Sequence, residues 1–473
     1  MTSIHLFTDD LRLADNPALA AAVSAGPVVP LFVLDDSADD AWRPGPAARA
    51  WRTHSLAALE RSLQRLGAWL VVRSGDTATQ VLAVARETGA GAVHVAASVV
   101  PARAAWQRRL TEALRQQGIS LALHSPNLLH EPGSLVTEDG RPYRVFTAFY
   151  RAFERRVALT APLPAPERIT VPAVRPRSEP LPSSPPDAPP RLLDAFEPGE
   201  TGARQRMARF LSDGIATYAE RRDVPAVDGT SRLSPHLAFG ELSVRELAHR
   251  TAALAEAVPA AANGARAFLR QLAWREFAYH LLAAFPHTVD RPLRPAFERF
   301  PWSYDEQASE VWRAGRTGYP IVDAGMRELA QTGWMHNRVR MAVASFLTKD
   351  LLQPWQDGAR WFWQRLADAD LADNTLGWQW VAGCGADAQP FFRIFNPVVQ
   401  SRRFDPDGEY VRRWVPELAR VPARWIHAPW EAPATELATA GVRLGEDYPR
   451  PLVDHRVARA RALAALKTVR GTG

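Results

Sequence analysis

The sequence contains a single cysteine, Cys384, which excludes an intramolecular disulfide and any zinc site built on paired cysteines. Its longest apolar stretches, such as Ala90–Val100, are too short or too interrupted to span a bilayer. The 12 histidines are scattered, without the spacing of a metal site. These absences argue against a secreted disulfide-rich protein, a membrane protein and a metalloenzyme. We expect a cytoplasmic protein that has no metal and no membrane partner.

The glycine-rich motifs of common nucleotide sites are also missing. No GxGxxG and no GxxxxGK[ST] follows any predicted strand, and Gly89 and Gly91 precede a strand instead of following one. The sequence therefore argues against a classical NAD or P-loop site.

What is present indicates a globular chain with two unlike parts. Of 473 residues, 47% are hydrophobic and 23% charged, an ordinary globular balance, and the net charge of +6 permits a nucleic-acid partner. The 16 tryptophans fall into two groups, one ending at Trp106 and the other running from Trp274 to Trp430. Such a shift in composition predicts two units with different interiors.

The N-terminal part alternates short apolar runs with segments long enough for helices, such as Ala47–Leu66 and Pro101–Gln117. Strands separated by helical crossovers form a parallel sheet, so we expect an α/β, Rossmann-like domain over residues 1–130. The predicted strands are Ser3–Phe7, Val28–Asp35, Trp69–Arg73, Ala92–Ala97 and Ser120–His124.

Helical patterning dominates from Gln205 onward, which predicts an all-helical domain over residues 205–473. Residues 131–204 have weaker signals and include a proline-rich stretch at 161–191, so we expect an extended connector there. Ser243 and Glu246 form a capping box, and Ser234 is a candidate N-cap because Pro235 follows it.

Three segments of the helical part carry chemistry. Residues 228–235 place hydroxyls and Arg232 on a turn that opens a helix, which suits a phosphate, although a plain capped helix start explains them too. Gln271, Trp274 and Arg275 share a helix face, where they could stack on a base or be ordinary half-buried residues. Asp368, Asp370 and Asp373 precede Trp378 and Trp380, and if partly buried they need a cation such as Arg340.

The motifs LFTDDLRLADNPAL, DGTSRLSP, QLAWREF, TGYPIVDAGMREL, GWMHNRVRM, LADNTLGWQW and RIFNPVVQ occur in the order found in the photolyase/cryptochrome family. Outside the proline-rich connector nearly the whole chain resembles that family, most closely the bacterial class I cyclobutane pyrimidine dimer photolyases. The resemblance implies an N-terminal α/β antenna domain, a helical FAD- and DNA-binding catalytic domain, and light-driven repair by a monomer.

The resemblance also assigns residues by position. It implies that reduced FAD is held by Tyr218, Thr230, Ser231, Arg232, Leu233, Ser234, Phe268, Arg275, Arg340, Asp368, Ala369 and Asp370. It implies that Asn374 faces the flavin N5 and that Trp378, Trp355 and Trp312 form the tryptophan triad that photoreduces the flavin. The residues implied near the DNA or the flipped-out dimer are Arg222, Gln271, Trp274, Asn337, Arg338, Met341, Trp380 and Gln400.

Two departures from the family pattern leave the lesion type and the antenna open. Gln271 stands where many cyclobutane dimer photolyases have glutamate and is shared with (6-4) photolyases, yet Asn337 and Met341 replace the histidines of that subfamily. A DASH-type protein and a cryptochrome that senses blue light without repair are further candidate functions. Residues 100–103 lack the Asn-Glu of folate-binding relatives, which leaves a deazaflavin, a flavin or an empty antenna site open and favours deazaflavin over folate.

Overall fold

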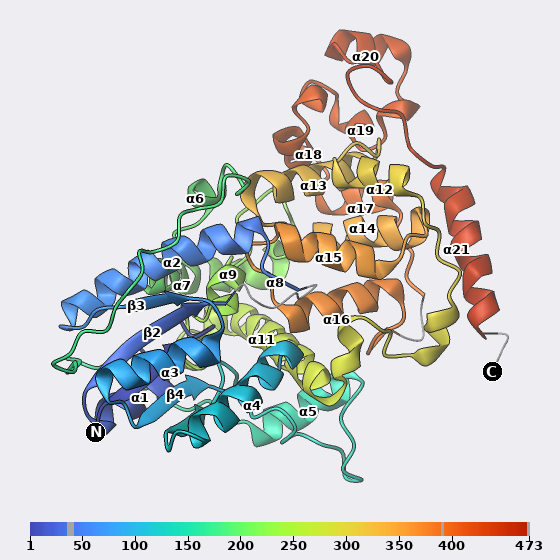
Figure 1. The fold of residues 1–473 in the computed structure, drawn as a ribbon. Coiled ribbons are helices and arrows are strands. Elements are labelled where there is room, and N and C mark those ends of the chain that lie inside the picture. The colour runs from blue at the N-terminus through green and yellow to red at the C-terminus, as the bar shows by residue number, and fades with distance from the viewer. Residues whose placement is uncertain (36–41, 389–391, 471–473) are drawn as a thin grey trace.

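The computed structural model describes residues 1–35, 42–388 and 392–470. It places a small α/β unit at the N-terminal end and a larger helical unit beside it, as Figure 1 shows in blue and in green to red. Both predicted fold types are confirmed.

The sheet has five parallel strands in the order β3-β2-β1-β4-β5. Consecutive strands of the chain are joined through helical crossovers, which is the connection that parallel strands require. The strands are β1 (Ser3–Phe7), β2 (Val28–Leu34), β3 (Val71–Ser74), β4 (Ala92–Ala96) and β5 (Ser120–His124). These bounds agree with the predicted strands to within about two residues.

The crossover helices begin where the sequence supplies a cap or a proline. Asn16 accepts a hydrogen bond from the backbone N–H of Leu19, and Asp76 accepts one from that of Thr79. The helices are α1 (Pro17–Ala25), α2 (Pro46–Arg65), α3 (Thr77–Thr88) and α4 (Pro101–Arg115). Two buried apolar clusters, around Phe32 and around Val93, fill the space between the sheet and these helices.

The predicted connector contains more helix than we expected. Helix α5 (Phe146–Arg156) buries Phe146, Phe149 and Phe153 against α11 (Ala262–Ala284), and α6 (Leu192–Ala195) and the start of α7 (Glu200–Arg209) also lie before residue 205. The spacing of the three phenylalanines is that of an amphipathic helix, so this element was readable from the sequence. Residues 157–190 contain no helix or strand.

The helical unit is built on α11 and the helices that pack around it. The short helices that follow α7 are α8 (Tyr218–Arg221) and α9 (Ser234–Ala238). The remaining helices are α10 (Val244–Ala257), α12 (Glu306–Arg313), α13 (Pro320–Thr332), α14 (Asn337–Ser345), α15 (Trp355–Arg365), α16 (Leu371–Ala382), α17 (Pro397–Phe404), α18 (Glu409–Trp414), α19 (Ala423–Ile426), α20 (Ala434–Ala440) and α21 (His455–Arg470).

The α/β unit is fixed to the helical unit by buried polar contacts. Arg245 donates to both carboxylate oxygens of Asp15, at 2.6 and 3.0 Å. The indole N–H of Trp51 donates to Glu241 at 2.9 Å. Such contacts hold the two units in one orientation, because breaking either removes a hydrogen-bond donor from a buried carboxylate.

Among the residues that the structure describes, no helix is both long and apolar enough to cross a membrane. The same residues contain no cluster of three or more histidine, cysteine or acidic side chains that could hold a metal ion.

Candidate active site

A cavity of about 600 Å³ opens in the helical unit between α8, α9, α11, α14 and α16. It collects most of the site residues that the sequence predicted. These are Tyr218, Arg222, Thr230, Ser231, Arg232, Leu233, Ser234, Phe268, Gln271, Trp274, Arg275, Asn337, Arg338, Arg340, Met341, Asp368, Asp370, Asn374, Trp378 and Trp380.

Four predicted residues do not line this cavity. Trp312 and Trp355 are buried in the apolar core of the helical unit, and Ala369 packs against that core between two residues that do line the cavity. Gln400 lies on α17 and is partly exposed. Ala369 and Gln400 therefore have no direct contact with the cavity, which does not support their predicted roles.

Hydroxyl groups and a guanidinium form one end of the cavity, at residues 228–235. Arg232 has a positive φ of 50°, a conformation that a non-glycine residue rarely adopts. Asp228 holds this turn, since it pairs with Arg206 at 2.8 Å and with Arg232 at 3.4 Å. Ser234 does not cap α9 with its side chain, contrary to our prediction, because its hydroxyl accepts a hydrogen bond from Trp334 instead.

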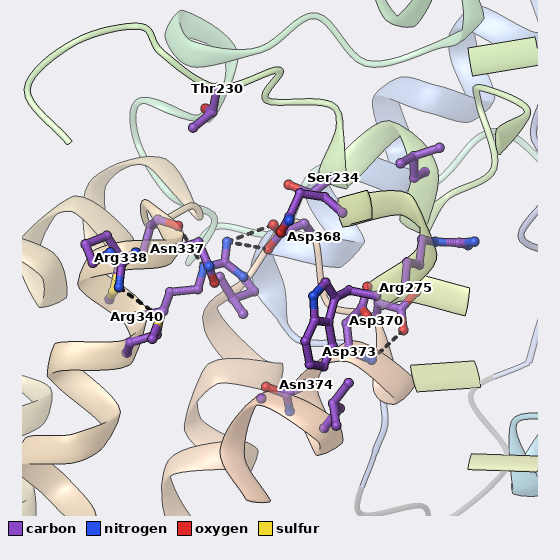
Figure 2. A pocket seen from close by; sticks show the side chains of 18 of the residues that line it. Thr230, Ser234, Arg275, Asn337, Arg338, Arg340, Asp368, Asp370, Asp373 and Asn374 are labelled. Atoms are coloured by element: carbon purple, nitrogen blue, oxygen red, sulfur yellow. Dashed lines mark hydrogen bonds and ion pairs between the residues drawn. The ribbon is translucent and has the colours of Figure 1, made fainter. Parts of the chain in front are cut away.

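An ion pair occupies the middle of the cavity, where Figure 2 shows its dashed lines. One terminal nitrogen of Arg340 donates to both oxygens of Asp368, at 3.0 and 2.7 Å, and its Nε donates to the carbonyl of Met335. The Asp368 side chain is only 3% exposed. A buried carboxylate requires such a partner, so the pairing that we predicted from the acidic run is confirmed.

Asp370 and Arg275 lie together on another wall (Figure 2). Asp370 caps α16 by accepting from the backbone N–H of Ala372, and its second oxygen accepts from the hydroxyl of Tyr279 at 2.7 Å. Arg275 lies over the ring of Tyr279 and donates to the carbonyl of Asn127. Burial and the adjacent Asp370 raise the pKa of Tyr279 well above its usual value, so its hydroxyl stays a donor.

Asn374 projects into the cavity from α16, one turn after Asp370. Its side-chain N–H donates to the carbonyl of Ala359 on α15 at 3.0 Å. This bond fixes the amide orientation, so its oxygen and its second N–H remain for a ligand.

The predicted tryptophan chain differs from the expected one at its outer end. The rings of Trp378 and Trp312 meet edge to face with centroids 6.4 Å apart. However, Trp312 is 1% exposed, and its indole N–H donates to the carbonyl of Val343. A ring that delivers charge to solvent must reach the surface, so the geometry does not support Trp312 as that outer end.

Trp302 meets this requirement better, and the sequence analysis missed it. It is partly exposed and packs against the same apolar core as Trp355. The N–H of Ser303, its neighbour, donates to the carbonyl of Leu352 at 2.7 Å, which places Trp302 next to the loop that leads into Trp355. Its partial exposure was the property that the sequence could not supply.

At the open end of the cavity, Trp274 has one face covered by Phe146 of α5. The two rings are parallel within 7° and their centroids are 3.6 Å apart. The ring of Trp380 is covered in turn by the guanidinium of Arg393 at 4.6 Å. Each of the two tryptophans thus has one ring face covered, and Gln271 lies one helical turn from Trp274 on the same wall.

A carboxylate that we did not predict holds two basic residues at the rim. Asp223 lies 2.7 Å from a terminal nitrogen of Arg338 and 3.8 Å from Nε of Arg222. Arg338 also lies over the ring of Phe404 at 4.4 Å. The basic side chains predicted near DNA are therefore oriented in advance.

The cavity suits FAD in the chemistry of its walls. The hydroxyls and the guanidinium at one end can donate hydrogen bonds to a pyrophosphate. The aromatic rings of Trp274, Trp378 and Phe268 can pack against the planar rings of FAD. The Arg340–Asp368 pair and the Asn374 amide supply donors and acceptors for a polar ring edge.

Comparison with known proteins agrees with this geometry. A family described as DNA photolyase matches residues 3–167, and the FAD binding domain of DNA photolyase matches residues 268–468. The chain is 47% identical to a deoxyribodipyrimidine photo-lyase of Agrobacterium fabrum, with 98% of each chain covered. It is 40% identical to cryptochrome-1 of Arabidopsis thaliana, covering 98% of this chain and 70% of that protein.

The crystal structure of a bacterial class III photolyase from Agrobacterium tumefaciens superposes with a TM-score of 0.95. It shares 47% identity and covers 100% of this chain and 98% of that one. The two-unit fold and its large cavity are those of a flavoprotein. The chain belongs to the photolyase/cryptochrome family. The finer prediction of class I is not specifically supported, because this similar structure is a class III photolyase.

Proposed function

We propose that this protein repairs cyclobutane pyrimidine dimers in DNA with light, using reduced FAD. The observation that carries the proposal is one cavity that has a phosphate-binding end, a planar aromatic middle and a basic open rim. Full-length relatives named deoxyribodipyrimidine photo-lyase support it. Reduced FAD, when bound, supplies an electron to the lesion under light and takes it back after the cyclobutane bonds have broken.

The protein's own residues bind and position the two reactants. The hydroxyls of Thr230, Ser231 and Ser234 and the guanidinium of Arg232, which line one end of the cavity, would hold the pyrophosphate of FAD. Asn374 would offer the flavin a neutral amide, which adds no charge there. Because Arg340 and Asp368 neutralise each other, they orient the ring by hydrogen bonds at no cost in net charge.

The open end receives the lesion. A flipped-out dimer stacks on the free faces of Trp274 and Trp380, and Gln271 and Asn337 donate hydrogen bonds to its carbonyls. Arg222 and Arg338 contact the adjacent phosphates, an attraction that weakens as salt rises.

The residue types at this end favour cyclobutane dimers over (6-4) lesions. With Asn337 and Met341 in place, the described residues that line the cavity include no histidine. The histidines that the resemblance associates with (6-4) repair are therefore missing from the described part of the wall.

For photoreduction of the flavin we propose the order Trp378, Trp355, Trp302. Trp378 lines the cavity, Trp355 is buried behind it, and Trp302 is partly exposed. This order replaces Trp312 as the outer end.

We further propose that the protein is a class III photolyase that works as a monomer in the cytoplasm. The similarity to the class III structure supports the subclass. The antenna prediction, deazaflavin in preference to folate, stays a prediction; a folate-type near-UV band in the purified protein would contradict it.

The 40% identity to a plant cryptochrome favours a light sensor as the second candidate. One experiment separates the two functions: reduced protein is mixed with a dimer-containing oligonucleotide, illuminated or kept dark, and assayed for intact thymines. Repair in the light alone supports the proposal. No repair in either sample, with FAD bound, favours the sensor.

A further inference from the structure

Three carboxylates reach the cavity from the segment that begins α16, and only two of them are paired. Asp368 is matched by Arg340, and Asp370 by the hydroxyl of Tyr279 and by the backbone. The side chain of Asp373 makes no hydrogen bond or ion pair with any residue that the structure describes, although its backbone N–H donates to Asp370. The side chain is exposed, and it lines the cavity.

The cations near Asp373 already have other partners. Arg340 is engaged by Asp368, and Arg275 donates to the carbonyl of Asn127 and lies 3.6 Å from Glu276. The charged and titratable groups that act on Asp373 or respond to it are Asp368, Asp370, Arg275, Arg340 and Tyr279. Because both arginines are engaged elsewhere, they lower the pKa of Asp373 by less than burial and the adjacent Asp370 raise it.

A proton is thus held more tightly on Asp373 than on an ordinary aspartate. The Asp373 side chain reaches solvent through the open cavity, yet desolvation by the protein that surrounds it, then the charge of Asp370, raise the pKa of Asp373 to about 8. A ligand that fills the cavity displaces the water that reaches the carboxyl, and a carboxylate without water or a cation is costly. The pyrophosphate of the cofactor adds further negative charge to the same cavity, which raises this pKa again.

We propose that Asp373 carries a proton on its carboxyl in the filled cavity, and that FAD binding draws this proton from solvent whenever the carboxyl is ionised beforehand. The inference rests on the FAD site of the proposed function and concerns a residue beside Asn374 that the sequence analysis left out of the site. One O–H bond forms on Asp373, and nothing is oxidised or reduced. The neutral carboxyl is a hydrogen-bond donor, whereas the carboxylate can only accept.

The test measures protons instead of repair. Protein stripped of FAD is titrated with FAD in a calorimeter, in two buffers with different enthalpies of ionisation, at a pH about one unit above the pKa of about 8. The wild type is expected to take up close to one proton there, and much less at a pH well below 8, where Asp373 is already protonated. Above about pH 8 its dissociation constant is expected to rise with pH by up to about tenfold per unit, because one proton is linked to binding.

The variant Asp373→Asn keeps the shape of the side chain but cannot ionise. It is expected to bind FAD without the proton and with a nearly flat pH dependence; Asp373→Ala serves as a second variant. Asp290→Asn, which removes an exposed carboxylate outside the cavity, controls for net charge and is expected to behave as the wild type.

Two results would overturn the inference: binding by the wild type at the higher pH without proton uptake, or equal uptake by Asp373→Asn. A wild-type protein that takes up no FAD at all would overturn the proposed function as well, so the two failures are distinguishable.

Discussion

Trp378 packs against the bare backbone of Gly358. A β-carbon built at this glycine lies 2.1 Å from Cη2 of the Trp378 indole and 2.3 Å from Cζ3. The two residues come from neighbouring helices, α16 and α15, so the glycine sets how closely an indole at the cavity wall approaches the core.

Gly358→Ala is expected to displace the Trp378 ring and destabilise the protein by about 1–3 kcal/mol, the usual cost of overpacking a core. Thermal or denaturant unfolding measures this cost. In a Trp378→Phe background the cost is expected to shrink, because phenylalanine lacks the two clashing atoms. An equal cost in both backgrounds would mean that the glycine is needed for another reason.

Trp378→Phe is expected to slow photoreduction of oxidised flavin strongly, because a phenyl ring is a much poorer electron donor than an indole. Repair by enzyme that is reduced beforehand is expected to stay nearly intact. Both rates are followed on the same preparation by flavin absorbance and by a thymine assay. Equal loss of the two activities contradicts the assignment.

Trp302→Phe and Trp312→Phe separate the two candidates for the outer end. Trp302 is partly exposed and Trp312 is buried, so only the first variant is expected to slow photoreduction. Transient absorption after a light pulse gives the rate, with melting temperatures as the check on folding. A loss confined to Trp312→Phe would restore the order predicted from sequence.

Gln271→Ala is expected to weaken binding of dimer-containing DNA by about 0.5–1.5 kcal/mol, the net value of a typical hydrogen bond. Binding of undamaged DNA is expected to change less, because Gln271 lies inside the cavity and not on the outer surface. Fluorescence anisotropy with both oligonucleotides measures the difference. A uniform loss would place Gln271 outside the lesion contacts.

Asp223→Asn frees Arg338 from its ion pair at the rim. Affinity for undamaged DNA is expected to rise, and the slope of log K against log salt to steepen by about one, because one more cation can meet a phosphate. Glu220→Gln removes a nearby exposed charge that forms no ion pair in the described structure, and is the matched control. Equal slopes in the two variants would argue against the role of Asp223.

Much of the fold can be predicted from the sequence because it depends on the types and spacing of residues close together in the chain. The strands follow runs of β-branched residues, and the Ser243 cap of α10 follows from residue types a fixed distance apart. The acidic run predicted a need for a cation such as Arg340, because a buried carboxylate requires one, and the family resemblance implied that Asp368 is its partner.

What the sequence could not supply was exposure and long-range contact. Trp302 and Trp312 are the same residue type, so the sequence does not distinguish them. Only the folded structure shows that Trp302 is partly exposed and Trp312 is buried. Phe146 lies 128 residues before Trp274, so the local sequence around either residue does not predict that their rings stack. Asp223 had no visible role because its nearer arginine partner, Arg338, comes from α14, far along the chain.

The stacking of Phe146 on Trp274 limits how much of the N-terminal part can be removed without changing the cavity wall. Helix α5 belongs to neither large unit by sequence pattern, yet its Phe146 covers the Trp274 ring, on which we propose that the damaged bases stack. A fragment that starts at residue 205 leaves that indole uncovered and free to rotate. Truncation to the helical unit therefore weakens the proposed lesion-binding surface, even though every residue that we propose to touch the lesion is still present.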